Sequence, residues 1–396
     1  MNTTQDDNLI LAVNSGSSSL KLGFFEKSGN EQEVLRGTAH NIGRADGTLR
    51  LESPGGSILL ERNVCESQED ALRELMQSSL QHLGRKPVAV GHRVVHGGPV
   101  LIQHQLVTPS VLEQLKAAEH FAPLHIPQSL KLVEDTNALL PGIPTYVCFD
   151  TAFHRTLPEE ARRFALPATL VGEEIHRYGF HGLSYESIVH RLGNGIPARV
   201  VIAHLGNGSS LCALRRGTSI DTTMGLTPTG GIPMSTRSGD LDPGVLLFLL
   251  RTGHIGIEAL EDVLNHNSGI RALSGGEADM RALLASAQAG DKDATLALKV
   301  YTTAIRKTIG AYAALLGGID MLVFAGGIGE NSPEIRSQIC DGLEFLRLSP
   351  NSCADRVRVI RSEEERQIAR ICRSMLGPPT PRPSDNRRKM RTEADS

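Results

Sequence analysis

The sequence has few of the features that mark nucleic-acid-binding, secreted or membrane proteins. Its 396 residues include no tryptophan and only 4% aromatic residues, and the formal net charge is −3. So small a charge argues against a nucleic acid or an anionic membrane as the main partner. The six cysteines are scattered without a CxxC or another metal-ligand spacing, which is typical of reduced thiols in the cytosol. Since no signal-like segment or apolar run of transmembrane length occurs either, we expect a soluble cytoplasmic protein.

The most common nucleotide-binding motifs are absent as well. No GxxxxGK[ST] occurs anywhere, and the stretch Gly206-Asn207-Gly208 lacks the third glycine of GxGxxG. By motif, the chain is therefore neither a P-loop protein nor a Rossmann dehydrogenase.

Strand-like and helix-like segments alternate along the chain, which favours an α/β fold. Apolar runs predict strands at 10–13, 88–91, 145–149, 200–204 and 321–324. Helical periodicity predicts helices at 68–83, 109–118, 242–251, 291–316 and 332–343. Because single cores rarely grow past roughly 250–300 residues, a chain of this length predicts two domains. The proline-rich and then charged segment 377–396 predicts a disordered tail, with a basic interaction tail as the alternative.

Three glycine-rich stretches follow apolar runs. Residues 9–25 read LILAVNSGSSSLKLGFF and residues 201–214 read VIAHLGNGSSLCAL. In both, an apolar run enters a turn of small residues and leaves through Ser-Ser-Leu, which indicates either a duplicated domain or two ordinary hairpins. The third reads LVFAGGIGENS. Here we expect a strand that ends at the glycine-rich residues 326–329, followed by an acidic and an amide residue and then by a helix that opens at Ser332. Exposed backbone N–H groups in such turns suit phosphate oxygens, although tight connections are the simpler alternative.

Charged and polar side chains stand near predicted strand ends or in loops of small residues. Arg93 lies in GHRVVHGG, Asp150 in FDTAFH, His181 in YGFHG and Arg237 in TRSGD. Taken singly, each has a structural alternative as a cap, a core histidine or a surface ion pair. Arginines neutralise carboxylates and phosphoryl oxygens, and an aspartate can hold Mg²⁺. Together with the glycine-rich turns, these residues predict phosphoryl transfer without a covalent intermediate.

In order and spacing, these stretches resemble the acetokinase family, from Leu9 to about Ala369, and APLHIP and DMR extend the likeness. The resemblance implies an α/β fold of the actin-like ATPase superfamily. It has two actin-like (ribonuclease H-like) domains, related by duplication, that face across a nucleotide-binding cleft. The N-terminal domain would span 1–150, completed by a C-terminal helix near 365–376, and the nucleotide-binding domain would span 151–364.

The activity that the resemblance implies is acetate kinase activity, the reversible transfer of a phosphoryl group from ATP to acetate that gives acetyl phosphate and ADP. It also implies Mg²⁺ (or Mn²⁺) as the cofactor and a cytoplasmic homodimer. A propionate or other short-chain acyl kinase stays open as an alternative, because it differs only in pocket depth. A non-kinase actin-like ATPase, which needs no carboxylate site, is a more remote one.

The resemblance further implies site residues by their match to the family's motifs. The catalytic residues would be Asp150, His181 and Arg237. The substrate-binding residues would be Arg93, Val95, Leu124, Phe180 and Pro228, whose mostly apolar wall disfavours a sugar or glycerol acceptor. The nucleotide-binding residues would be Lys21, His204, Leu205, Gly206, Asn207, Gly208, Asp279, Met280, Arg281, Gly327, Ile328, Gly329, Glu330 and Asn331. The metal ligands would be Asn14 and Glu364.

Besides Arg271 and the loop 227–235, which lacks a usual acidic residue, two departures from the family pattern concern the proposed site. Glu364 lies in Glu363-Glu364-Glu365 where the family usually has Asn-Glu-Glu, so a neighbouring register of this match stays open. Ile126 replaces the asparagine of the usual PLHNP motif, which puts the turnover and the fine substrate preference in doubt. The chemistry itself is simple, because a carboxylate is already ionised at pH 7 and needs no general base. We therefore expect Asp150 to organise Mg²⁺ or its waters.

Overall fold

The computed structural model describes residues 8–16, 18–63, 65–123, 125–348 and 355–377, so the predicted tail lies outside it except for Gly377. Within these residues, the first sheet has eight strands in the order β5-β4-β3-β2-β1-β6-β8-β7. They are β1 (Leu9–Gly16), β2 (Ser19–Glu26), β3 (Glu33–His40), β4 (Thr48–Glu52), β5 (Ile58–Asn63), β6 (Ala89–Val94), β7 (Gln105–Leu106) and β8 (Thr145–Phe149). The second sheet has the order β11-β10-β9-β12-β13. Its strands are β9 (Arg199–Leu205), β10 (Ser209–Arg215), β11 (Thr218–Thr222), β12 (Met321–Ala325) and β13 (Val357–Val359).

The two sheets share one topology. In the first, β1, β2 and β3 are antiparallel neighbours, β6 is parallel to β1, and β8 is parallel to β6. In the second, β9, β10 and β11 are antiparallel neighbours, β12 is parallel to β9, and β13 is parallel to β12. The order β3-β2-β1-β6-β8 is thus repeated as β11-β10-β9-β12-β13. This repetition confirms the predicted pair of related α/β domains.

The two glycine- and serine-rich stretches form equivalent hairpins. The first joins β1 to β2 and pairs Asn14 with Lys21, and the second joins β9 to β10 and pairs His204 with Ser210. The turn of the first hairpin is shorter than the run of five small residues from Ser15 to Ser19, because Gly16 still pairs with Ser19. Small side chains let the ladder continue close to the turn, so Asn14 and His204 sit on strand ends rather than in loops.

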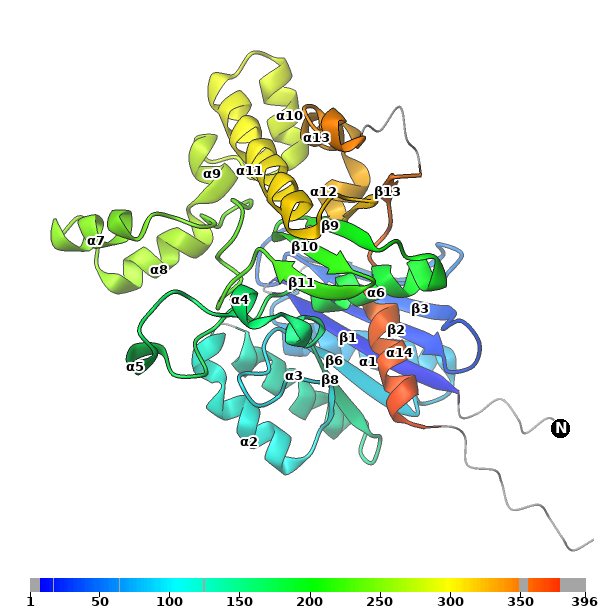
Figure 1. Ribbon diagram of the computed structural model, residues 1–396. Coiled ribbons are helices and arrows are strands. Elements are labelled where there is room, and N and C mark those ends of the chain that lie inside the picture. The colour runs from blue at the N-terminus through cyan, green and yellow to red at the C-terminus, as the bar shows by residue number, and fades with distance from the viewer. Residues whose placement is uncertain (1–7, 17, 64, 124, 349–354, 378–396) are drawn as a thin grey trace, which may run out of the picture.

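The helices of the described residues cover both sheets and fill the space between them (Figure 1). They are α1 (Gln68–Leu83), α2 (Pro109–Ala117), α3 (Ile126–Leu139), α4 (Glu159–Arg162), α5 (Ala168–Val171), α6 (Gly182–Leu192), α7 (Pro243–Arg251), α8 (Ile257–His266), α9 (Gly269–Leu273), α10 (Met280–Gln288), α11 (Lys292–Leu316), α12 (Gly326–Asn331), α13 (Pro333–Cys340) and α14 (Glu364–Met375). The long helix α11 forms much of the core on one face of the second sheet. Helices α6 and α14 lie side by side between the two sheets.

Helix α14 comes from the end of the described chain yet packs on the first sheet. Its residues Ile368 and Cys372 are fully buried against β1 and β6. Gly91 on β6 makes this approach possible, because a Cβ there would collide with both of these side chains. The packing brings Glu364, at the first position of α14, to the ends of the strands that carry the predicted site. The domain boundaries at 150 and 364 stay a prediction.

The glycine-rich stretch after β12 agrees with the prediction in part. The helix expected to open at Ser332 is confirmed, because Ser332 caps α13 by accepting a hydrogen bond from the Ile335 amide. The stretch before it was not predicted to be helical, but α12 begins directly at Gly326. Gly326 has φ +74° and lies so close to Leu205 that a side chain would not fit, so the connection is a sharp turn, as in the simpler alternative.

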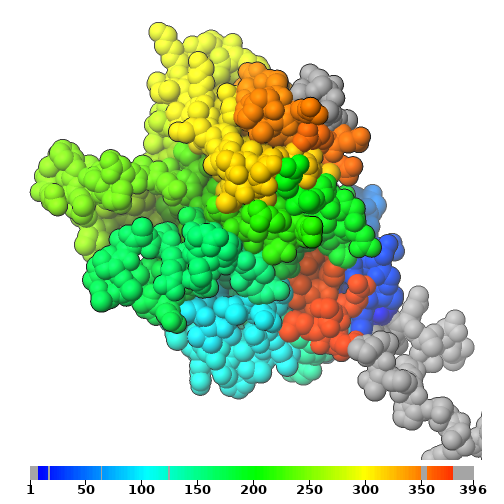
Figure 2. Space-filling model, viewed as in Figure 1, coloured from blue at the N-terminus to red at the C-terminus, as the bar shows by residue number. Residues whose placement is uncertain are grey.

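Helices α7 and α8 project from the body of the molecule, as the yellow-green arm in Figure 2 shows. In α7, no residue is buried. Among the residues that the model describes, no helix is both long and apolar enough to cross a membrane.

Candidate active site

Adjacent strands of the first sheet bring Asn14, Arg93 and Asp150 to the face that carries α14. Side chains alternate along a strand, so Asn14 shares its face with Ile10 and Ala12, which pack against α14. Arg93 follows Gly91 by two positions on β6, and Asp150 directly follows β8. All three therefore meet beyond the N-terminal end of α14.

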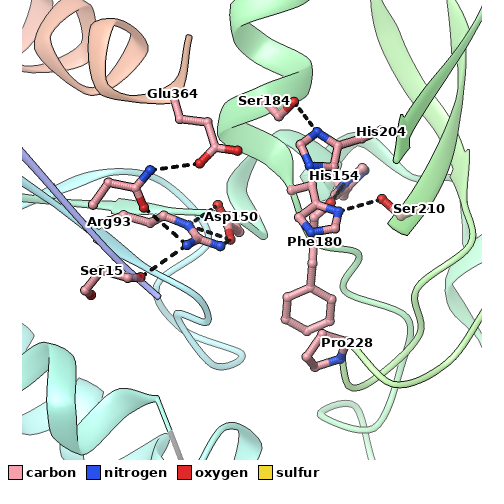
Figure 3. Close-up of polar contacts among 12 residues, drawn as sticks. Ser15, Arg93, Asp150, His154, Phe180, Ser184, His204, Ser210, Pro228 and Glu364 are labelled. Carbon is pink, nitrogen blue, oxygen red and sulfur yellow. Dashed lines mark hydrogen bonds and ion pairs between the residues drawn. The ribbon is translucent and has the colours of Figure 1, made fainter. Parts of the chain in front are cut away.

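Arg93 and Asp150 form a buried ion pair (Figure 3). Arg93 donates from Nη2 to Asp150 Oδ2 at 2.6 Å and from Nε to both carboxylate oxygens, at 3.0 and 3.2 Å. Its Nη1 donates to Asn14 Oδ1 and to the Ser15 carbonyl, both at 3.2 Å. Burial raises the pKa of Asp150, and the neighbouring guanidinium opposes this shift. The fork of Arg93 thus orients the carboxylate and the amide together.

Glu364 joins this group from α14. Asn14 Nδ2 donates to Glu364 Oε2 at 3.0 Å and to Glu365 Oε1 at 2.8 Å, and Lys21 Nζ lies 3.8 Å from the same Glu365 oxygen. Burial would raise the pKa of Glu364, but the charges of Arg93 and its other basic neighbours outweigh it, so the pKa is lowered. Glu364 is therefore held as a carboxylate.

Two stacked histidines come from the second domain and face this group. The rings of His181 and His204 lie 4.3 Å apart between centroids. His181 Nδ1 lies 2.9 Å from Ser210 Oγ, and His204 Nδ1 lies 2.7 Å from Ser184 Oγ. Figure 3 shows Ser184, His204 and Ser210 on the side opposite Arg93, Asp150 and Glu364. Burial, together with nearby positive charge, lowers the pKa of both histidines, so both rings are neutral.

The loop from Gly206 to Gly208 and the side chain of Arg237 border the histidines. A Cβ at Gly208 would lie 3.3 Å from His181 Nε2 and 3.5 Å from Arg237 Nη1. Arg237 Nη1 also donates to the Pro228 carbonyl at 3.2 Å. Burial and the charge of Arg93 lower the pKa of Arg237. Positive charge from both domains therefore converges at this point.

An apolar cluster stands beside the charged groups. It brings together Val95 and Phe180, two of the predicted wall residues, with Met224 and Met234. All four side chains are buried. Pro228 is half-buried in the neighbouring loop, whereas Leu124 lies outside the described residues. The cluster provides a small apolar surface next to an anion-binding group, which suits a short acyl chain.

Some of the predicted nucleotide-binding residues have side chains in the core, and others have polar side chains that bond to the nearby backbone. The side chains of Leu205 and Met280 belong to the core of the second domain, so only their backbone could meet a ligand. Asp279 caps α10 by accepting from the Arg281 and Ala282 amides. Glu330 Oε1 accepts from the Gly326 and Ser362 amides, and Asn331 Nδ2 donates to the Gly327 carbonyl. The polar side chains of Asp279, Glu330 and Asn331 thus stabilise the backbone around α10 and α12.

A cavity of about 480 Å³ lies between the two domains beside α14. Its lining includes Lys21 from the first domain, His204, Gly327 and Glu330 from the second, and Glu364. These five residues, predicted from the sequence to bind nucleotide or metal, thus line one hollow, whereas Asn14, residues 206–208 and residues 279–281 are not part of its lining.

A family model described as the acetokinase family matches residues 9–370. The chain belongs to the acetokinase family. An acetate kinase of Coprothermobacter proteolyticus is 39% identical over 91% of this chain and 97% of the relative. A solved acetate kinase of Porphyromonas gingivalis is 34% identical, with a TM-score of 0.82 over 93% of this chain and 100% of that one. A solved propionate kinase of Francisella tularensis is 32% identical, with a TM-score of 0.83 over 91% of this chain and 98% of that one.

Membership places the chain among the phosphotransferases that use a carboxyl group as acceptor, on the two-domain actin-like fold. Ile126, which replaces the asparagine of the acetokinase motif, lies in the apolar core. Ile126 is the first residue of α3 and is fully buried with Leu130 and Val133 in an apolar cluster. Its side chain therefore contributes to the core of the first domain.

The metal ligands expected for an acetokinase fit the donors that are present. Among the described residues, no three His, Cys, Asp or Glu side chains form a group that could hold a metal ion by themselves. Glu364 and Asn14 do supply the hard oxygen ligands that Mg²⁺ prefers, and Mg²⁺ commonly takes its remaining ligands from water and substrate phosphates. The donor set therefore fits a Mg²⁺ that binds together with a nucleotide.

Sequence reasoning missed several residues around the site. Ser210 contacts His181 directly, and Tyr185 contacts Ser210. The only sequence signal for either residue was the Ser-Ser-Leu repeat, which includes Ser210. His125, whose pKa is lowered to about 4 by burial and by Arg237 and Arg93, was signalled only by the APLHIP motif. Met224 and Met234 carried no local signal, because their contacts are made across the fold.

Proposed function

We propose that this chain transfers the γ-phosphoryl group of ATP to acetate, reversibly, in a direct in-line displacement that gives acetyl phosphate and ADP. The observation that carries the proposal is the convergence of Arg93, from the first domain, and Arg237, from the second, beside neutral His181. Family membership and relatives named acetate kinase support the same reaction.

The geometry suits the meeting of two anions. Acetate and the terminal phosphate of ATP repel each other, and Arg93, Arg237 and Lys21 supply the opposing positive charge. His181, being neutral, acts as a hydrogen-bond donor to the equatorial oxygens. Asp150, in this proposal, holds Arg93 in place and organises the metal with its waters.

We assign the metal site to Asn14 and Glu364. Bound Mg²⁺ would neutralise negative charge on the phosphate oxygens. We assign nucleotide binding to Lys21, to the backbone of 204–208 and 327–331, and to the start of α10 at 279–281. Mn²⁺, which shares a preference for oxygen ligands, could replace Mg²⁺.

The acyl group would contact the cluster of Val95 and Phe180, next to the loop of Pro228. Leu124, which lies outside the described residues, is proposed for the same wall. A short-chain acyl kinase that prefers propionate is the second candidate, because the solved propionate kinase has a similar fold at 32% identity. The two activities differ only in how closely this wall fits the acid.

We also propose a homodimer in the cytoplasm. The projecting arm of α7 and α8 exposes Val245, Leu247, Phe248 and Ile257, with Phe248 60% and Ile257 71% exposed. A second copy of the chain is the occupant that we propose for this apolar face. The cysteines that the model describes are all free, which agrees with a reducing compartment.

A hydroxylamine-trapping assay with ATP and Mg²⁺ tests the activity across formate, acetate, propionate and butyrate. Acyl phosphate formation that is fastest with acetate is the expected result. Faster reaction with propionate or butyrate would replace acetate by the longer acid. ADP formation that does not depend on any acid would instead indicate a non-kinase ATPase.

A further inference from the structure

His181 stands at a backbone position that few residues adopt. Its φ of +60° and ψ of 23° lie in the left-handed region, directly before α6. The flanking backbone is fixed on both sides, since the Gly182 amide donates to the Asp150 carbonyl and the Tyr185 amide donates to the His181 carbonyl. A strained conformation at a functional site persists only where its surroundings determine it.

A chain of buried hydroxyl groups runs from the ring of His181 into the second domain. His181 Nδ1 lies 2.9 Å from Ser210 Oγ, and Ser210 Oγ lies 2.5 Å from the Tyr185 hydroxyl. Ser210 and Tyr185 are fully buried, and the contact at Ser210 is drawn in Figure 3. Among the residues that the model describes, Tyr185 Oη and His181 Nδ1 have no further hydrogen-bond partner.

The tautomer of His181 decides whether every hydrogen of this chain has an acceptor. If Tyr185 donates to Ser210 and Ser210 donates to His181 Nδ1, every buried hydroxyl hydrogen has an acceptor. If His181 Nδ1 carries the proton instead, it donates to Ser210, and the hydrogen of either the Ser210 or the Tyr185 hydroxyl is then buried without an acceptor. A buried, unpaired donor is costly, so the first arrangement is favoured.

We propose that Tyr185 and Ser210 are positioning residues that hold His181 in the tautomer with its proton on Nε2. This inference rests on the proposed function, in which His181 donates a hydrogen bond from Nε2 to the phosphoryl group during transfer. The other tautomer would present a lone pair to negatively charged oxygens and repel them. The left-handed backbone fixes the position of the His181 ring, and the buried hydroxyl chain fixes its tautomer.

The surroundings of Nε2 agree with this assignment. Nε2 faces the Gly206–Gly208 loop close to Arg237 Nη1, as the distances from Gly208 show. Burial and nearby positive groups lower the pKa of His181 far below its ordinary value. A neutral ring can donate from only one of its nitrogens, so the tautomer decides whether it donates toward the site at all.

The neighbouring histidine repeats the arrangement. Ser184 Oγ lies 2.7 Å from His204 Nδ1, and the His204 ring stacks on that of His181. A serine hydroxyl thus meets Nδ1 in both rings, although the two serines come from different elements.

Nitrogen-15 NMR of the histidine-labelled protein, without substrate, reads the tautomer directly. In the native protein we expect His181 Nδ1 to be unprotonated and Nε2 to carry the proton. Tyr185→Phe keeps the buried ring but removes the donor that polarises Ser210, so the bond from Ser210 to Nδ1 should weaken and the share of the other tautomer should rise. We expect its kcat for acetyl phosphate formation to fall about tenfold, with KM for acetate and ATP changed less than twofold.

Ser210→Ala removes the group that contacts Nδ1, and a larger loss in kcat of about a hundredfold should follow. Should this variant misfold, Tyr185→Phe alone decides the question. The matched control is Tyr301→Phe, because Tyr301 Oη lies 3.0 Å from Ser209 Oγ, the adjacent serine on the opposite face of β10. It removes the same kind of bond and should leave the His181 nitrogen signals as in the native protein.

A proton on His181 Nδ1 in the native protein would overturn the proposal. So would Tyr185→Phe with a native tautomer signal and native kcat. The NMR result does not depend on turnover, so a native protein with the expected tautomer but no acetate-dependent reaction would refute the proposed function and leave the tautomer assignment standing.

Discussion

Asn14 and Glu364 lie 350 positions apart in the chain, yet their side chains are joined by a hydrogen bond of 3.0 Å. The bond connects β1, near the start of the chain, to the first residue of α14. It places the Glu364 carboxylate where the charge of Arg93 acts on it. The metal assignment depends on this contact between the two ends of the fold.

Glu364→Gln tests the metal assignment. Loss of a charged oxygen ligand should lower the apparent affinity for Mg²⁺ by about 10–100-fold, measured as the Mg²⁺ dependence of acetyl phosphate formation. Glu363→Gln is the matched control, because Glu363 pairs instead with Arg366 and Arg191. A larger effect at Glu363 would show that the motif match is one residue out of register.

Asp150→Asn should remove most of the turnover while the protein stays folded. The variant would lose the charge that orients Arg93, and kcat should fall by the equivalent of about 2–4 kcal/mol. Asp320→Asn is a suitable control, since Asp320 forms a similar 2.6 Å pair with Arg199 away from the site. Near-native turnover in folded Asp150→Asn would contradict the role that we propose.

Val95→Ala tests the acyl wall. One buried methylene is worth about 0.8 kcal/mol in transfer, but forcing it into a packed site costs about 1–3 kcal/mol, so the native protein should prefer acetate over propionate and butyrate. Removing two methyl groups from the wall should lower the acetate/propionate ratio of kcat/KM about tenfold, or about 1.4 kcal/mol. The exposed Leu106 provides the control, because Leu106→Ala should leave the ratio unchanged. Equal slowing of both acids by Val95→Ala would show that Val95 does not line the pocket.

His96 makes the stability of the fold depend on pH. Burial lowers its pKa from 6.5 to about 3, so below pH 6.5 the unfolded chain binds a proton that the folded protein does not. Stability should therefore fall as the pH drops from 6.5 toward 3. His96 packs among Phe121, Tyr178 and Phe180, so His96→Phe keeps an aromatic ring in the cluster. Between pH 7 and pH 5, this variant should lose about 2 kcal/mol less unfolding free energy than the native protein in urea titrations. Parallel losses in the two proteins would rule out His96 as the titrating group.

Local patterns were sufficient for the individual elements. The strand predicted at 145–149 and the helix predicted at 68–83 match β8 and α1 in their bounds. Asp242 and Asp291, placed at helix starts from sequence, are the N-caps of α7 and α11, because a capping carboxylate acts on amides only two or three residues away. The short helix α12 was not predicted, because the sharp turn into it at Gly326 depends on the close approach of Leu205 from another strand.

By itself, the sequence determined the α/β class, the repeated hairpins and the residue types of a phosphoryl-transfer site, since each of these depends on neighbours within a few residues. Only the tertiary structure decided that Glu364 and Glu365 both contact Asn14, that Arg93 pairs with Asp150, and that Ser210 connects Tyr185 to His181. Such contacts join residues tens to hundreds of positions apart. They depend on how α6 and α14 pack between the two sheets, and no local spacing encodes that packing.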